Sequence, residues 1–390
     1  MESPFEQRLT DCQSRLEDGP AQLAVCAPGS NLTYLTGFDE SPSERHLLLF
    51  IPHASADASP TFVAPTMYNS QLEDLPLSRL KLRLWDDNDD PLEAISRTLE
   101  SFDLDLEGDG QPAILVDDRM WATFMQDLQS LCPAAEFGLA SDVLEGLRIR
   151  KDEAELATLA RAGELADRVS MEIRSRGEQL CGLTERELAA EIDRLLAEYG
   201  GHEPAFETIV ASGPNSARPH HHSGDRTIQR GDPLVLDFGA FVDSDLAGDT
   251  QYPGDQTRTM VVGDPPEGYE TIHELVAEAQ QAAVDAVKPG VTAGEIDAVA
   301  REHIADADYG DAFVHRTGHG VGLEVHEPPY IVADNDRKLE AGMVFSIEPG
   351  IYLEDRFGIR IEDLVAVTDN GAERLNESPR GWETGGIHER

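Results

Sequence analysis

The chain has 390 residues, which is long enough for two domains with separate hydrophobic cores. Its 75 acidic residues against 31 basic ones give a formal net charge of −44 at pH 7, which argues against binding to nucleic acid or to an anionic membrane. Hydrophobic residues make up 40% of the chain, too many for a disordered acidic protein, so we expect a folded protein whose acidic surface is adapted to high salt, as in a halophile.

The start of the chain and its cysteines favour a cytoplasmic protein. Residues 1–6 have neither the basic nor the apolar segment of a secretory signal, and no apolar run approaches the length of a membrane span. The four cysteines are scattered without a Cys-x-x-Cys pair, which favours reduced thiols.

Residues 1–145 alternate strand-like and helix-like segments, which predicts a first domain that contains both. Short apolar runs predict buried strands at 21–26, 46–51, 61–64 and 114–116. Helices are expected at 91–102 and 121–131, and the acidic stretch 85–90 indicates a solvated loop. A domain boundary is expected near 146–151.

The second part of the chain, 146–390, begins with an amphipathic helix and then shows a faint internal duplication. The helix starts near Asp152 and has one apolar face, formed by Leu159, Ala162, Ala166 and Val169. Two later helices each open with a capping box, at 184–187 and 292–295, and each is followed by a histidine-bearing segment, a glycine, an apolar strand and an acid. Asp237 lies six residues after Gly231, and Glu348 lies six after Gly342. The pattern predicts two related halves that face a shared centre, although chance similarity of two αβ units is the alternative.

Five polar residues in this second part are each flanked by a short apolar or glycine-rich segment that would hold one side chain in a fixed direction; we call them the framed residues. They are Asp237, Asp255, His319, Glu348 and Glu362. Apolar strands rarely bury carboxylates unless positive charge compensates them. Four carboxylates and one imidazole suit a pair of divalent cations that activate water.

These motifs, in this order, resemble the pita-bread metallopeptidases, in particular their Xaa-Pro dipeptidase and Xaa-Pro aminopeptidase branch. The most specific piece is Gly-His-Gly-Val-Gly-Leu-Glu-Val-His-Glu at 318–327, and the segment 28–38 resembles a stretch of the family's amino-terminal domain. The resemblance implies an α/β (α+β) protein of two domains. A creatinase-like amino-terminal domain would occupy 1–145, and a pita-bread catalytic domain with a pseudo-twofold axis would occupy 146–390.

The resemblance assigns metal ligation to all five framed residues, with Asp255 and Glu362 as the carboxylates that bridge two cations. Mn²⁺ or Co²⁺ is expected, because an oxygen-rich site with one imidazole suits these ions better than sulfur-seeking ones. Arg360 lies two residues before Glu362 in an alternating strand, so it is expected to face the site; a surface arginine is the alternative.

The resemblance implies hydrolysis of the peptide bond before proline, in small peptides with proline at the second position. Glu348 would accept a proton from the attacking water, and His220 and His326 would stabilise the carbonyl oxygen and the tetrahedral intermediate. Tyr352 matches a family tyrosine near the site. A homodimer is expected.

Three more histidines accompany these residues. His315 suits either a core position or a supporting position beside the site, and His221 and His222 are interpreted as solvated neighbours of His220.

One spacing departs from the family. Asp237 and Asp255 lie eighteen residues apart, farther than in the family, which predicts a lengthened hairpin loop between them. Asp245 or Asp249 could compete as the second ligand, but the β-branched run that follows Asp255 favours Asp255. Two other functions stay open: a metal-free pita-bread scaffold that binds peptides, and a creatinase-like amidinohydrolase.

Overall fold

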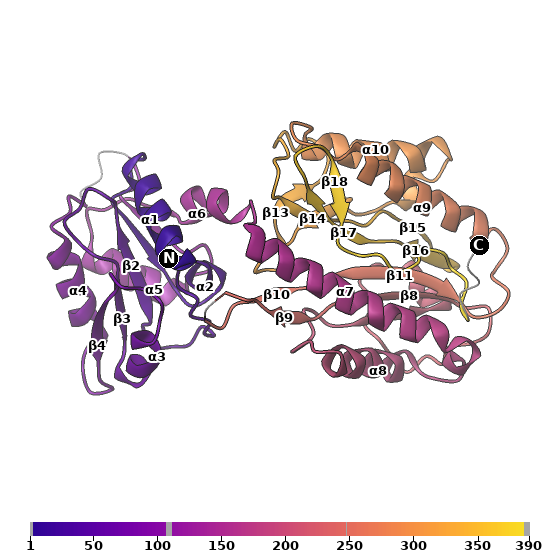
Figure 1. Ribbon diagram of the computed structural model, residues 1–390, viewed down its shortest axis with the longest axis horizontal. Coiled ribbons are helices and arrows are strands. Elements are labelled where there is room, and N and C mark those ends of the chain that lie inside the picture. The colour runs from indigo at the N-terminus through magenta and orange to yellow at the C-terminus, as the bar shows by residue number, and fades with distance from the viewer. Residues whose placement is uncertain (1–2, 107–110, 247, 386–390) are drawn as a thin grey trace. The chain divides into compact units, whose positions relative to one another are not determined.

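The computed structural model describes residues 3–106, 111–246 and 248–385 (Figure 1). The chain divides into two compact units, one formed by Met1–Arg148 with Asp245–Thr250 and the other by Ile149–Ser244 with Gln251–Arg390. The domain bounds 1–145 and 146–390 stay predictions, although the first break lies only three residues beyond residue 145. Within the described ranges, no helix combines the length and the apolar character that a bilayer span requires.

The first unit is built on a six-stranded mixed sheet with the order β4-β3-β2-β1-β5-β6. The β1–β2 and β2–β3 pairs are antiparallel, and the other three pairs are parallel. The strands are β1 (Leu23–Cys26), β2 (Leu48–Pro52), β3 (Thr61–Pro65), β4 (Lys81–Trp85), β5 (Ile114–Val116) and β6 (Phe137–Leu139). The helices are α1 (Pro4–Glu17), α2 (Ser30–Thr36), α3 (Asn69–Glu73), α4 (Pro91–Phe102), α5 (Ala122–Leu131), α6 (Ser141–Arg148) and the 3₁₀ turn η1 (Thr66–Tyr68).

All four strands and both helices predicted for this unit are present. The strand β4 was missed because its first four residues are exposed or only partly buried, so the sequence shows no continuous apolar run there. The expected solvated loop at 85–90 is wrong at its first residue. Trp85 ends β4 with 8% of its surface exposed, and its indole N–H donates to the carbonyl of His46 at 3.0 Å.

The second unit contains two sheets and two hairpins. One sheet has the order β11-β8-β7, the other has the order β13-β12-β14-β17-β18, and the hairpins are β9–β10 and β15–β16. The strands are β7 (Ile209–Ser212), β8 (Pro233–Phe238), β9 (Phe241–Asp243), β10 (Gln251–Pro253), β11 (Gln256–Val261), β12 (Gly318–Gly320), β13 (Glu327–Ile331), β14 (Val344–Ile347), β15 (Gly350–Leu353), β16 (Phe357–Arg360), β17 (Asp363–Val367) and β18 (Ala372–Arg374).

Two helix pairs bury the apolar faces of these sheets. The helices are α7 (Glu153–Ser175), α8 (Glu185–Glu198), α9 (Tyr269–Ala286) and α10 (Ala293–Asp306), with 3₁₀ turns η2 (Gly177–Leu180), η3 (Gly213–Ala217) and η4 (Gly310–Ala312). One core joins α7 and α8 to β7, β8 and β11, and another joins α9 and α10 to the strands from β13 to β17. The predicted apolar face of α7 is confirmed, since Leu159, Ala162, Ala166 and Val169 are all fully buried.

The two halves of this unit repeat the same turns, which supports the predicted duplication. Gly182 and Gly290 precede the capped helices with φ of 95° and 91°, and both donate backbone hydrogen bonds to equivalent carbonyls, those of Ile228 and Leu339. Gly231 and Gly342 precede β8 and β14 with φ of 86° and 90°. These positive values favour glycine, so the repeated glycines have a conformational reason.

Candidate metal centre

All five framed residues line one cavity of about 510 Å³ in the second unit. Asp237 lies in β8, Asp255 directly precedes β11 and His319 is the middle residue of β12. Glu348 directly follows β14, and Glu362 lies between β16 and β17. Strand ends from both halves therefore bring the five side chains to a common centre, as the sequence predicted.

Three of these residues already have the mutual spacing of a metal site. Asp255, His319 and Glu362 are buried, and each offers one ligand atom within 4.8 Å of the other two. The Nε2 atom of His319 also lies 3.3 Å from an oxygen of Glu348. One site of divalent-cation size is therefore lined by a nitrogen and several oxygens.

The tautomer of His319 is fixed by the backbone. Its Nδ1 lies 3.2 Å from the carbonyl oxygen of Gly320, which can only accept, so Nδ1 carries the proton and Nε2 presents a lone pair. Burial, together with the neighbouring His326, lowers the pKa of His319 to about 3. The imidazole is therefore neutral near pH 7, which is the form that binds metal.

Close packing of two strands explains why position 318, directly before His319, is a glycine. A Cβ atom on Gly318 would lie 1.8 Å from the carbonyl oxygen of Ser346 on β14. Only glycine lets the two strands approach this closely, and the same approach brings the hydroxyl of Ser346 within 3.1 Å of the His319 N–H and 3.2 Å of Glu348.

Burial and mutual repulsion disfavour the ionised forms of three of these carboxylates. Burial and the neighbouring Asp237 and Glu348 raise the pKa of Asp255 well above its usual range. Burial and Asp255 do the same to Glu362, and burial with Asp237 raises the pKa of Glu348 to about 7. Bound dications would supply the missing charge and restore the ionised forms.

Asp237 gives a second test of whether cations fit this site. Its Oδ2 accepts a hydrogen bond from Arg360 at 2.6 Å, whereas its buried Oδ1 accepts none from the residues that the structure describes. A buried carboxylate oxygen without a partner is costly. The residues therefore fit a bound cation, which would satisfy this oxygen.

Arg360 lines the cavity, as predicted, but the strand expected to carry both Arg360 and Glu362 ends at Arg360, and Glu362 lies between β16 and β17. Besides Asp237, its guanidinium donates to the hydroxyl of Tyr352 at 2.9 Å and to the hydroxyl of Thr257 at 3.1 Å. Thr257 in turn donates to a carboxylate oxygen of Glu362 at 2.7 Å. Thr257 was missed as a supporting residue, although it lies two positions after Asp255 on the same face of an alternating strand.

His315 belongs to the wall of the cavity and not to a remote core. Its Nδ1 donates to the carbonyl of Arg316, so its Nε2 must accept the hydrogen bond from Tyr352 at 2.9 Å. Burial, with Arg360 nearby, lowers the pKa of His315 to about 4, which keeps it neutral. Of the two positions that the sequence left open, the supporting one is observed.

His220 and His326 also line the cavity, and the rings of His319 and His326 are centred 4.1 Å apart. His222 has an exposed side chain, as expected. The interpretation of His221 as a solvated neighbour is wrong. Its side chain is 11% exposed, and its Nε2 lies 2.7 Å from the buried carboxylate of Glu185, a residue that no local sequence pattern connects with the site.

The two competing acids of the lengthened loop do not reach the centre. Asp245 and Asp249 are exposed and are not among the described residues that line the cavity. Their loop belongs to the first unit, where the N–H of Asp249 donates to the carbonyl of Gly37 at 3.0 Å. The expectation that these acids are solvated loop residues is confirmed.

Comparisons with known proteins agree with this architecture. Residues 157–369 match Metallopeptidase family M24, and residues 8–150 match the Creatinase/Prolidase N-terminal domain. The chain is 39% identical over 380 residues to a probable dipeptidase, PepE, of Mycobacterium tuberculosis, covering 96% of this chain and 95% of that one. It is 46% identical over 266 residues to an Xaa-Pro dipeptidase of Pyrococcus furiosus, covering 68% and 74%. The crystal structure of a prolidase from Thermococcus sibiricus superimposes with a TM-score of 0.87 at 37% identity, covering 97% and 99%.

Proposed function

Because the chain belongs to metallopeptidase family M24, we propose that its cavity hydrolyses the peptide bond before proline in small peptides. The observation that carries the proposal is the convergence of four carboxylates and one neutral imidazole on a single cavity. Relatives named Xaa-Pro dipeptidase support the substrate class. The family itself implies divalent metal ions, typically two.

The residues that would hold these ions are Asp237, Asp255, His319, Glu348 and Glu362, with Asp255 and Glu362 shared between the two. Mn²⁺ or Co²⁺ suits this oxygen-rich set with its single imidazole. When bound, such ions lower the pKa of water and polarise a carbonyl group.

The other steps of the reaction, proton transfer and stabilisation of the carbonyl oxygen, would fall to side chains of the cavity. Glu348, whose pKa burial raises to about 7, is suited to accept a proton from the attacking water and to pass it to the proline nitrogen. His220 and His326 would donate to the oxygen of the scissile carbonyl, which gains negative charge during attack. Arg360 would hold Asp237 in place through its 2.6 Å hydrogen bond.

The two other functions have less support. A metal-free peptide-binding scaffold would not need five potential ligands around one cavity, and a creatinase-like amidinohydrolase would lack that ligand set. Neither explains the buried Oδ1 of Asp237, which lacks a hydrogen-bond partner among the described residues.

We further propose a cytoplasmic homodimer from a halophile, with domains at 1–145 and 146–390. The net charge of −44 and the four free cysteines support the salt-rich, reducing compartment. Light scattering after gel filtration in molar KCl would test the dimer, which a mass of one chain would contradict.

The experiment that tests the activity compares matched substrates. The protein is purified in high salt and loaded with Mn²⁺ or Co²⁺, and then offered an Xaa-Pro dipeptide, the corresponding Xaa-Ala dipeptide and a longer Xaa-Pro peptide. We expect release of proline, or shortening of the longer peptide by one residue, with little cleavage of Xaa-Ala. Exhaustive chelation should abolish cleavage, and restored metal should recover it. Full activity in protein from which all metal has been removed would contradict the proposal.

A further inference from the structure

Behind the cavity, the strand β11 and the segment 360–363 meet although they belong to different sheets. The backbone N–H of Glu362 donates to the carbonyl of Thr257 at 3.1 Å, and side chains make further contacts across the join. The hydroxyl of Thr259 donates to the carbonyl of Arg360 at 2.8 Å and accepts from its N–H at 3.0 Å. This join connects the half that carries Asp255 with the half that carries Glu362.

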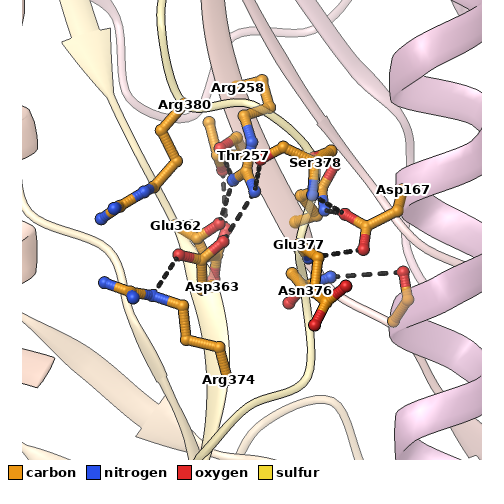
Figure 2. Close-up of polar contacts among 12 residues, drawn as sticks. Asp167, Thr257, Arg258, Glu362, Asp363, Arg374, Asn376, Glu377, Ser378 and Arg380 are labelled. Atoms are coloured by element: carbon orange, nitrogen blue, oxygen red, sulfur yellow. Dashed lines mark hydrogen bonds and ion pairs between the residues drawn. The ribbon is translucent and has the colours of Figure 1, made fainter. Parts of the chain in front are cut away.

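Arg258 adds two contacts across the join, to the carbonyl of Glu362 and to the side chain of Asp363 (Figure 2). It is fully buried, and its guanidinium donates to the backbone carbonyls of Thr257, Glu362 and Ser378. The same group forms an ion pair of 2.7 Å with Asp363, whose side chain is also fully buried. One side chain on β11 thus binds both the backbone carbonyl of Glu362 and the carboxylate of Asp363.

Asp363 is itself held in place from the side away from the cavity. Its second carboxylate oxygen accepts a hydrogen bond at 3.0 Å from Arg374 (Figure 2). The same oxygen accepts another at 3.0 Å from Gln280. The pair with Arg258 therefore belongs to a wider network that fixes its geometry. A planar guanidinium suits such a role better than an ammonium, because its donors have fixed directions.

Glu362 is consequently fixed on both sides. On the cavity side, its carboxylate accepts from Thr257 at 2.7 Å; on the far side, its carbonyl accepts from Arg258. Alternation along β11 explains this arrangement, since neighbouring residues point to opposite faces of a strand.

We propose that Arg258 and Asp363 are a positioning pair that sets the distance between Asp255 and Glu362, and thereby the affinity of the centre for metal. The inference rests on the proposed function, in which these two carboxylates share the ions. Residues that orient metal ligands without touching the metal typically contribute about 10- to 100-fold to affinity.

The test measures the binding of Mn²⁺ alone to metal-free protein, by calorimetry or by competition with a fluorescent chelator. Arg258→Lys keeps the positive charge but cannot reach three carbonyls and Asp363 together, so we expect Mn²⁺ binding at least about 10-fold weaker. Asp363→Asn, which keeps the shape and removes the charge, should weaken binding by a similar factor.

Arg174→Lys is the matched control. Arg174 is 4% exposed, donates to the carbonyls of Pro379 and Glu383 and, like Arg258, has a buried Nε without a hydrogen-bond partner among the described residues. Among the described residues, Arg174 forms no hydrogen bond or ion pair with residues 360–363. Arg174→Lys should therefore lower the melting temperature of the metal-free protein, yet leave Mn²⁺ affinity within about twofold of the parent.

The outcomes separate this inference from the function on which it rests. A parent protein that binds neither Mn²⁺ nor Co²⁺ would contradict the proposed function itself. A parent that binds Mn²⁺, with Arg258→Lys and Asp363→Asn binding it equally well, would overturn the positioning pair alone. An equal loss of affinity in Arg174→Lys would also overturn it, because a general loss of packing would then suffice. If Arg258→Lys does not fold, Asp363→Asn alone tests the positioning pair, and Mn²⁺ binding less than about 10-fold weaker than in the parent would overturn it.

Discussion

A carboxylate oxygen of Glu185 lies 2.7 Å from the Nε2 of His221, and this contact anchors the segment that carries His220. The same carboxylate accepts hydrogen bonds from Ser212 and Asn215 before the histidine and from Gly224 after it. Burial opposes the ionised form of Glu185, but the hydrogen bonds from Asn215 and His221 outweigh it and lower its pKa. A buried anion at the start of α8 thus organises a loop of the cavity.

Glu185→Gln should therefore lower kcat/KM by about tenfold or more while bound metal stays unchanged. Glutamine cannot accept all these hydrogen bonds, and the loop that presents His220 would lose its anchor. Steady-state kinetics with metal analysis would check this. Glu187→Gln is the matched control, because Glu187 lies in the same helical turn but is exposed, and its carboxylate accepts hydrogen bonds from Thr184 alone among the described residues. Equal effects of the two changes would contradict the role of Glu185.

Asp255→Asn should remove activity and lower the metal content by at least about half, because we propose that this carboxylate is shared by both ions. Asp255 is 4% exposed and lies 3.6 Å from the Nε2 of His319. Asp245→Asn and Asp249→Asn, on the exposed loop, should leave metal content and activity close to those of the parent. Metal loss in either loop variant, with normal metal in Asp255→Asn, would reverse the assignment.

His326→Ala should reduce kcat by about 10²–10³ with little change in metal content, because we assign His326 to the developing oxyanion and not to a metal. His222→Ala serves as the control, since His222 lines the same cavity with an exposed side chain and should change kcat little. If His326→Ala loses half of its bound metal, His326 is a ligand instead.

Acid should destabilise the protein partly through His273. Burial lowers the pKa of His273 to about 4, and its Nε2 donates to the carbonyl of Thr259 at 3.2 Å. The unfolded chain, with an ordinary histidine pKa near 6.5, binds the proton first. The free energy of unfolding should therefore fall as pH drops from about 6.5 to about 4, by an amount on the order of 3 kcal/mol from this group.

The measurement for His273 is denaturant unfolding of the metal-free protein across that pH range. His273→Gln keeps a donor for Thr259 but does not titrate, so the variant should lose stability less steeply than the parent. Parallel curves for the two proteins would show that His273 does not titrate with the expected shift.

Salt should stabilise the fold. With a net charge of −44, the acidic groups of the compact state repel one another. The Debye length over which such repulsion acts shortens from about 10 Å at 0.1 M salt to about 3 Å at 1 M. The melting temperature of the metal-free protein should rise by several degrees from low to molar KCl, measured with a chelator present so that metal binding does not contribute. A flat or falling curve would mean that the acidic surface is no salt adaptation.

The sequence alone determined the main features of this protein, because they depend on local patterns. Apolar runs gave the central strands of the first unit, and glycine and apolar frames marked the five side chains that meet at the cavity. Turn-forming residues in the long loop identified Asp245 and Asp249 as solvated, and alternation placed Arg360 on the cavity side. Each of these inferences needs only a few neighbouring residues.

The tertiary structure decided which side chains support that centre. Glu185 and His221 are 36 residues apart, and Arg258 and Asp363 are 105 apart, so no local pattern connects them. Nor could the sequence show that His315 bonds Tyr352 or that Thr257 bonds Glu362. Buried polar groups must find partners, but the folded chain alone determines which distant group comes within hydrogen-bonding distance.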